Sequence, residues 1–316
     1  MNNVIHMDEV TKQFHTSRDR PAVDKLTLNI PTGILYGLVG PDGAGKTTTL
    51  RMISTVMLPS NGNISVLGMD TRSQADPIRK QVGYMPQNFS LYPDLTVREN
   101  LNFFADIQQV SKERKPERMA EMLRFTRLGD FQNRRAAALS GGMKKKLALA
   151  CALIHEPRLL ILDEPSTGVD PVSRRELWQI LAEVVQQGVS VVVSTPYMDE
   201  AERCHLVGFL YNGKILSIGS PKDLRAELPY EVVEVKASPR KQMRKIAAEM
   251  EGVVEWRPVG DTLRLTIPDN GTAERVIQGL DERMRAENLK ITLLRKTNVM
   301  MEDVFVHLVN QQRGLK

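Results

Sequence analysis

The strongest constraint on the fold of this chain is a glycine-rich segment, Gly40–Thr47 (GPDGAGKT), which fits the pattern G-x-x-x-x-G-K-[ST] at every fixed position. A short, continuously apolar run, Ile34–Val39, leads directly into it, and such a run is typical of a buried strand. Residues Thr48–Val56 follow with helical spacing and end before Pro59. A buried strand, a glycine-rich turn and a helix in this order indicate an α/β fold that holds a phosphate group at the turn.

Each fixed residue of this segment has a physical role beside a phosphate. Glycines let backbone N–H groups approach the anion without a Cβ in the way, and the helix that follows directs its positive dipole end at the same point. The ammonium of Lys46 can reach the outer phosphates, and the hydroxyl of Thr47 can bind Mg²⁺. We therefore expect the chain to bind Mg-ATP. The residues expected to contact the nucleotide here are Gly40, Pro41, Asp42, Gly43, Ala44, Gly45, Lys46, Thr47 and Thr48.

A pair of adjacent carboxylates, Asp163 and Glu164, follows the apolar run Arg158–Leu162. Four apolar residues bury such a strand, so the two acids emerge at its carboxyl end, where ligands bind in open α/β sheets. Asp163 suits the Mg²⁺ shell, and Glu164 suits polarising the water that attacks the nucleotide. Two acids at the end of a strand are weak evidence alone, but they become strong evidence when a phosphate loop lies upstream.

A third segment, Ser140-Gly141-Gly142, begins another helical stretch shortly before these acids. Ser140 could simply cap that helix, with the two glycines as a flexible entry. The segment also offers a hydroxyl, bare backbone N–H groups and a helix N-terminus, which together form a second anion-binding device. Because one phosphate group rarely needs both devices, we expect the segment to serve the nucleotide of a second copy or subunit.

The remaining pattern divides the chain into three parts. Residues Val4–Val10 and Leu26–Ile30 alternate like strands of an antiparallel layer, and Asn88–Glu156 is mostly helical, with helices starting at Thr96 and Ser140. Beyond residue 228 the expected order is β-α-β-β-α-β, which is that of a ferredoxin-like module, followed by a closing helix. We expect an ATP-binding domain over residues 1–228, with a helical subdomain at about 88–157, and a small α+β domain over 229–316.

Composition limits the partners. The net charge of +5 comes from interspersed acids and bases rather than a basic block, so no nucleic-acid partner is expected. Cys151 and Cys204 lack metal-ligand spacing and are expected to be buried free thiols in a reducing cytosol. The N-terminus has no signal-peptide pattern, and no apolar run approaches the roughly 18 residues needed to span a bilayer. Any role at a membrane is therefore expected to require a partner.

These three segments, in this order and spacing, resemble the nucleotide-binding domain of ABC transporters over roughly residues 1 to 225. The resemblance implies that Gln87 contacts Mg²⁺ and the attacking water, that Phe14 stacks on adenine, and that Asp170 lies in a loop that meets the opposite subunit. It also implies that two domains close head to tail, so that each site pairs one chain's Gly40–Thr47 with the other chain's Ser140–Gly142. The expected catalytic residues are Glu164, Gln87 and Lys46; the expected Mg²⁺ ligands are Thr47, Gln87 and Asp163.

Longer stretches, including "LYPDLTVREN", "DPVSRRELW" and the C-terminal "MEDVFVHLV", are similar to ABC-2-type exporter ATPases, especially the first half of those that fuse two ATPase domains. This similarity implies a separate ABC-2-type membrane permease as partner, contacting Gln87 and the segment Asn88–Asn100. It places the chain at the cytoplasmic face of the inner or plasma membrane, with multidrug efflux as one activity. An import ATPase and a soluble ABC ATPase acting in translation or DNA maintenance are the alternatives.

One position departs from the family pattern. Where the family places a histidine that contacts the γ-phosphate, this chain has Pro196, which offers neither a side-chain donor nor a backbone N–H. Losing such a contact could cost on the order of 3 kcal/mol, or roughly a hundredfold in rate. We expect Thr195 to cap a helix with Pro196 at its first position. Met143 in place of the usual glutamine is a milder change. Because Glu164 is retained, we expect an asymmetric pair with a different ATPase chain, with a homodimer as the alternative.

Overall fold

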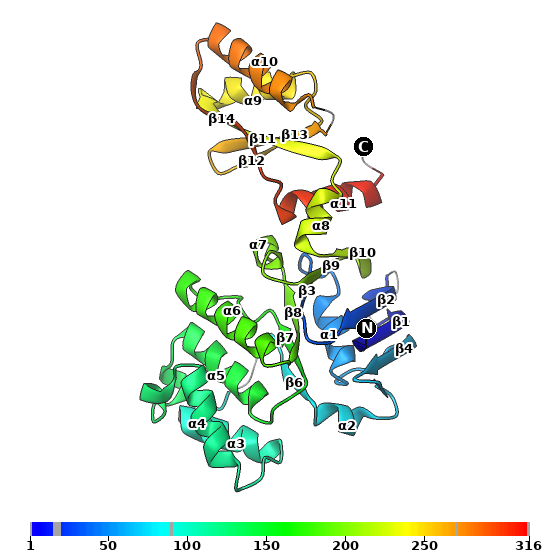
Figure 1. Cartoon of the computed structure of the whole chain (residues 1–316), viewed down its shortest axis with the longest axis vertical. Coiled ribbons are helices and arrows are strands. Elements are labelled where there is room, and N and C mark those ends of the chain that lie inside the picture. Colours follow the sequence, from blue (N-terminus) through cyan, green and yellow to red (C-terminus); the bar gives the residue numbers. More distant parts are fainter. Residues whose placement is uncertain (1, 15–19, 89–90, 270, 315–316) are drawn as a thin grey trace. The chain divides into compact units, whose positions relative to one another are not determined.

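A computed structural model describes residues 2–14, 20–88, 91–269 and 271–314. The chain forms two compact units, Met1–Pro221 and Lys222–Lys316, each with its own core. The domain boundary proposed from the sequence, after residue 228, would assign α8 (Pro221–Ala226) to the first domain. Figure 1 shows the elements of both units.

An antiparallel sheet forms one layer of the first unit. Its strand order is β2-β1-β4-β5, and the strands are β1 (Asn3–Lys12), β2 (Val23–Pro31), β4 (Asn61–Val66) and β5 (Met69–Asp70). Leu26, Leu28 and Ile30 of β2 are buried, while Thr27 and Asn29 between them are exposed. This alternation, expected from the sequence, places one face of the layer on the core.

A second sheet of six strands carries the nucleotide-binding motifs. Its order is β10-β9-β3-β8-β7-β6, and the strands are β3 (Leu35–Val39), β6 (Val82–Met85), β7 (Leu159–Asp163), β8 (Ser190–Thr195), β9 (Leu206–Tyr211) and β10 (Lys214–Gly219). All neighbours are parallel except β9 and β10. Every residue of β3, β7 and β8 is buried, as continuous apolar runs predict. The carboxyl ends of these three adjacent strands therefore meet at one edge.

Helices connect and cover these strands. In the first unit they are α1 (Lys46–Ile53), α2 (Ala75–Arg79), α3 (Val97–Ile107), α4 (Lys115–Phe125), α5 (Gly141–Leu153), α6 (Pro171–Gln186), α7 (Met198–Ala201) and the 3₁₀ turns η1 (Gly129–Phe131) and η2 (Ala136–Ala138). Leu50, Met52 and Ile53 of α1 belong to the same core as the inward face of β2. The helix after the glycine-rich loop is thus fixed by packing against the antiparallel layer.

Helices α3, α4 and α5 gather in the part of the chain for which a helical subdomain is predicted (Figure 1). Thr96 forms a capping box with Glu99 at the start of α3, and Ser140 caps α5, which confirms both predicted helix starts. Trp178 on α6 is 3% exposed and donates a hydrogen bond from Nε1 to Glu200. The tryptophan is a packing residue of the core.

The second unit has the predicted ferredoxin-like order. Its elements are β11 (Tyr230–Ser238), α9 (Arg240–Ala248), β12 (Glu255–Val259), β13 (Thr262–Pro268), α10 (Ala273–Ala286), β14 (Lys290–Thr297) and α11 (Met301–Gln312). The sheet order is β12-β13-β11-β14, with every pair antiparallel. Helices α9 and α10 pack on one face of the sheet, and α11 lies against the other (Figure 1).

Two further expectations concern single features. Cys151 and Cys204 are buried free thiols, as predicted, and burial raises the pKa of both. No helix among the described residues is long and apolar enough to cross a bilayer.

Candidate nucleotide-binding site

The glycine-rich loop joins β3 to α1 in a conformation that depends on its glycines. Gly45 is left-handed (φ 108°), and a Cβ there would lie 2.4 Å from the carbonyl oxygen of Ala22. A Cβ on Gly40 would lie 2.1 Å from the carbonyl oxygen of Leu210. The first turn of α1 has no acidic residue, and no side chain caps it. Its free N–H groups and positive dipole end are therefore left for an anion.

Lys46, the first residue of α1, is 4% exposed. Its ammonium donates hydrogen bonds to the carbonyl oxygens of Gly40 (2.8 Å) and Pro41 (3.0 Å), and it lies 3.2 Å from a carboxylate oxygen of Glu164. Asp42 is also near, at 3.9 Å, but its side chain is 93% exposed. The buried ammonium thus lies between the loop backbone and a carboxylate, where a phosphate oxygen could become its partner.

Asp163 is the last residue of β7, and only one of its two carboxylate oxygens has a hydrogen-bond partner among the described residues. Its Oδ1 accepts hydrogen bonds from the hydroxyls of Thr47 (3.1 Å) and Ser194 (2.7 Å). Its Oδ2 is buried and has no hydrogen-bond partner among the described residues. An unpartnered buried carboxylate oxygen beside a threonine hydroxyl is a donor set that fits Mg²⁺, which prefers oxygen ligands.

Glu164 follows in a left-handed conformation (φ 49°) and is 5% exposed. Its backbone N–H donates to the hydroxyl of Ser194 at 3.0 Å. The carboxylate accepts hydrogen bonds from Gln87 Nε2 at 2.9 Å and Thr167 Oγ1 at 3.4 Å, beside Lys46. The structure therefore brings together three predicted catalytic residues: Lys46, Glu164, which follows β7, and Gln87, which follows β6.

Ser194 and Lys145 also belong to this cluster and were not identified from the sequence. Ser194, at the end of β8, donates its hydroxyl to the Asp163 carboxylate and accepts the backbone N–H of Glu164. Lys145, on α5, donates to the carbonyl oxygen of Gln87 at 3.1 Å. Burial lowers the pKa of the Lys145 ammonium, while the carboxylates of Glu164 and Asp163 act in the opposite direction. Neither residue belongs to one of the predicted motifs. Ser194 reaches the site because β8 pairs with β7, and Lys145 reaches it because α5 packs against β6.

The segment Ser140–Gly142 begins α5 and packs beside the start of α6. Ser140 Oγ accepts from the N–H of Met143 at 3.3 Å, and a Cβ on Gly142 would lie 2.3 Å from Ser173 Oγ. Asp170 caps α6 beside it, accepting from the N–H groups of Val172 and Ser173. Within the described part of the chain, no hydrogen bond or ion pair joins this segment to Gly40–Thr47. A cleft of about 430 Å³ separates Gly141 from Gln87.

Phe14 lies just beyond the end of β1, half-buried, with the ammonium of Lys12 5.5 Å from its ring centroid. The neighbouring backbone approaches the loop, because Ala22 bonds to Lys12 and its carbonyl lies against Gly45. The ring is thus on the chain segment next to the phosphate loop, and its contact with adenine stays a prediction. Part of the predicted coupling segment, residues 89–90, lies outside the described residues.

The structure corrects one detail at Pro196. The residue was expected at the first position of a helix, but α7 begins at Met198, with Tyr197 as its N-cap. Thr195 does accept from the N–H of Tyr197 at 3.1 Å, so its hydroxyl stabilises the turn that precedes the helix. Gly40, the first residue of the phosphate loop, donates its N–H to the carbonyl of Thr195 at 3.2 Å. Pro196 therefore directly follows a residue that is hydrogen-bonded to the loop. The helix starts later because Thr195 forms a local turn of its own.

Comparisons with known proteins agree with this geometry. A family model described as "ABC transporter" matches residues 23–167. The chain is 40% identical over 309 residues to the "Probable multidrug ABC transporter ATP-binding protein YbhF" of Escherichia coli, covering 97% of this chain and 52% of that protein. It therefore spans about half the length of that relative. It is 36% identical to the "Nod factor export ATP-binding protein I" of Rhizobium etli, with 94% of each chain covered.

A solved structure carries the same fold. It is the dimeric, post-hydrolysis state of the ATP-binding cassette MJ0796 bound to ADP and Pi, with a TM-score of 0.63 and 27% identity. The match covers 68% of this chain and 98% of that one. Given this fold, the site geometry and similarity over nearly the full length of an export ATP-binding protein, the chain belongs to the ATP-binding proteins of ABC transporters, a family of ATPases.

Proposed function

We propose that this chain is the ATP-hydrolysing subunit of an ABC-2-type exporter. It would couple ATP binding and hydrolysis in a head-to-tail dimer to transport by a separate membrane permease. The observation that carries the proposal is the convergence of Lys46, Asp163, Glu164 and Gln87 at the carboxyl ends of adjacent strands, next to an anion-binding helix terminus.

The residues of the site divide the chemistry between them. The N–H groups of the loop and the ammonium of Lys46 would hold the phosphates and stabilise the charge that develops during transfer. Mg²⁺, held by Thr47 and Asp163 with Gln87 nearby, would neutralise phosphate charge. Glu164 would accept a hydrogen bond from the attacking water and orient it. When a phosphate takes Lys46 as partner, one oxygen of Glu164 is freed for that water.

Turnover at this site is proposed to be slow because of Pro196. Pro196 follows β8, which lies between β3 and β7 in the sheet, and it takes the place of the histidine that contacts the γ-phosphate in the family pattern. A site that retains Glu164 but lacks this donor would bind ATP well and hydrolyse it slowly. The intact Ser140–Gly142 segment would then complete the faster site of a different ATPase chain, and a homodimer with two slow sites is the alternative.

The names of the relatives favour export over the other functions that this fold can serve. One is named as a probable multidrug transporter protein and another as a Nod factor export protein, and both are similar over more than nine-tenths of this chain. An import ATPase and a soluble ABC ATPase have similar catalytic residues and remain the competing functions. The position of the subunit would be peripheral, at the cytoplasmic face of the membrane, through the permease.

Affinity purification of the tagged chain from detergent-solubilised membranes tests this assignment. We expect a polytopic membrane protein to co-purify, and ATP hydrolysis to rise when that protein is present. The Lys46→Ala variant, which removes the phosphate contact, should co-purify equally well without hydrolysis. Recovery of ribosomes or DNA in place of a membrane protein would overturn the exporter assignment.

A further inference from the structure

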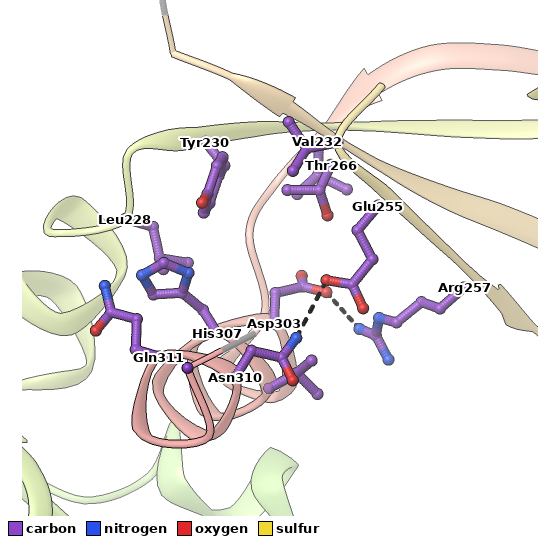
Figure 2. Close-up of a pocket in the computed structure, with 13 residues that line it drawn as sticks. Leu228, Tyr230, Val232, Glu255, Arg257, Thr266, Asp303, His307, Asn310 and Gln311 are labelled. Atoms are coloured by element: carbon purple, nitrogen blue, oxygen red, sulfur yellow. Dashed lines mark hydrogen bonds and ion pairs between the residues drawn. The ribbon is translucent and has the colours of Figure 1, made fainter. Parts of the chain in front are cut away.

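The second unit contains a cavity of its own, between the sheet and α11, with a volume of about 830 Å³ (Figure 2). Its walls come from β11, β12 and β13 on one side and from α11 on the other. A cavity of this size, with apolar walls and a few convergent polar groups, is typical of small-molecule sites. The nucleotide chemistry described above uses none of these residues.

The cavity is built by regular structure. Strand register places Val232, Thr266 and Glu255 in one row across the face of the sheet that α11 covers. The opposite wall is one face of α11, where Asp303, His307 and Asn310 recur at helical spacing. Because strands and a helix hold the lining, the positions of its polar groups are fixed.

The charges of the lining leave one carboxylate without a cation. Arg257 forms ion pairs with Glu302 and Asp303, and Arg264 forms one with Asp303. The two positive and two negative charges of these four side chains therefore cancel. Glu255 is exposed and has one hydrogen bond among the described residues, from the amide of Asn310 at 3.5 Å, and no ion pair (Figure 2). The cavity therefore has a net negative charge located at Glu255.

Aromatic and apolar side chains line the same cavity as Glu255. The rings of Tyr230 and His307 meet edge to face, with centroids 5.0 Å apart, and Figure 2 shows them on opposite walls. Burial lowers the pKa of His307, which favours the neutral imidazole, although Glu255 opposes this shift. Leu228, Val232 and Val306 complete an apolar wall. Aromatic faces attract cations, and apolar walls accept a hydrocarbon body.

We propose that this cavity binds an amphipathic organic cation, whose charge lies at Glu255 and whose apolar body lies against Tyr230, Val232 and Val306. An anion would meet Glu255 without a free arginine to compensate, and a strongly hydrated cation would gain nothing from the apolar wall. The site belongs to the second unit and does not depend on ATP hydrolysis.

Isothermal titration of the full chain, without nucleotide, with tetraphenylphosphonium and tetraphenylborate tests the proposal, because these ions have nearly the same shape and opposite charge. We expect saturable binding of the phosphonium and at least about tenfold weaker binding of the borate. Since the chain carries a net charge of +5, non-specific attraction would favour the borate instead. Equal binding of both ions, or no saturable binding of the phosphonium below about 1 mM, would overturn the proposal.

Variants locate the site. Glu255→Gln should weaken phosphonium binding by about tenfold, because it removes the charge and keeps the shape. The matched control is Glu251→Gln, an exposed glutamate outside the lining, which should leave the affinity unchanged. Val306→Trp should block both ions by filling the cavity, provided that its thermal unfolding matches that of the unaltered chain. Unchanged affinity in Glu255→Gln would contradict the proposed site whatever the tryptophan variant does.

Discussion

Asp163 and Glu164 are neighbours in the chain but have different partners. Asp163 is held by two hydroxyls and keeps a buried oxygen free, whereas Glu164 turns into the left-handed region and meets Gln87 and Lys46. The left-handed backbone of Glu164 (φ 49°) is unusual for a residue with a side chain, and it turns the carboxylate away from that of Asp163 toward different partners. At the scale of single residues, one acid is thus suited to a cation and the other to water.

The proposed effect of Pro196 can be measured directly. Pro196→His should raise ATP turnover several-fold, because the imidazole supplies a donor toward the γ-phosphate. Steady-state phosphate release measures this. Pro196→Ala is the matched control, because it removes the ring without adding a side-chain donor, and its turnover should stay close to that of the unaltered chain. If the histidine variant shows no gain, the slow-site hypothesis is wrong.

The loop glycine Gly45 is expected to tolerate no side chain. Gly45→Ala places a Cβ 2.4 Å from a backbone oxygen at φ 108°, so the loop must shift. We expect a loss of about 2 kcal/mol in stability and at least a tenfold loss of ATP affinity, measured by thermal unfolding and nucleotide titration. Gly33→Ala, also at positive φ but with no atom within 4 Å, should lose at most about 1 kcal/mol and keep ATP affinity. Equal ATP affinities in the two variants would count against the loop geometry.

At the scale of elements, α11 is joined to the sheet by a charged network. Asp303 binds Arg257 and Arg264, and Arg264 is 2% exposed. Burial alone would raise the pKa of Asp303, but hydrogen bonds from the Met300 N–H, Arg257 and Arg264 outweigh it, so the pKa is lowered. A carboxylate with a lowered pKa stabilises the fold above its unfolded pKa, near 3.9, and loses this contribution as pH falls through the folded value.

Asp303→Asn should therefore destabilise the second unit at neutral pH by about 3 kcal/mol, because it leaves a buried arginine without its counter-charge. Hydrogen exchange of the β11 and β13 amides measures this unit separately. The difference between the variant and the unaltered chain should shrink below about pH 4. Asp281→Asn, which breaks an exposed pair with Arg285, is the control and should cost less than about 1 kcal/mol. A difference that persists unchanged at acid pH would refute this role of the carboxylate.

Elements with a strong local signal could be predicted from the sequence. The glycine-rich loop, the apolar strands β3 and β7, and the helix starts at Thr96 and Ser140 follow from motifs and caps. Residues that act through tertiary contact could not. Lys145 and Ser194 reach the site only because α5 and β8 pack beside it. The start of α7 was misplaced because a hydrogen bond to Thr195 decides it.

At the scale of the whole molecule, the segment Ser140–Gly142 and the Gly40–Thr47 loop are two anion-binding features of one chain. Ser140–Gly142 presents a capped helix terminus with no bond to the Gly40–Thr47 loop among the described residues. We propose that Ser140–Gly142 contacts the nucleotide of a second subunit in a head-to-tail dimer. The second unit adds a separate cavity, so the chain combines a nucleotide site with a proposed site for an organic cation.

The central claim, that this chain binds ATP at the loop and hydrolyses it through Glu164, is tested most directly by single-turnover hydrolysis with Glu164→Gln. The account predicts unchanged or tighter ATP binding, with hydrolysis slower by about a hundredfold or more, because the group that orients water is lost. Glu183→Gln, an exposed glutamate on α6, serves as the control and should hydrolyse ATP like the unaltered chain. A Glu164→Gln variant that hydrolyses bound ATP at the unaltered rate would contradict the account.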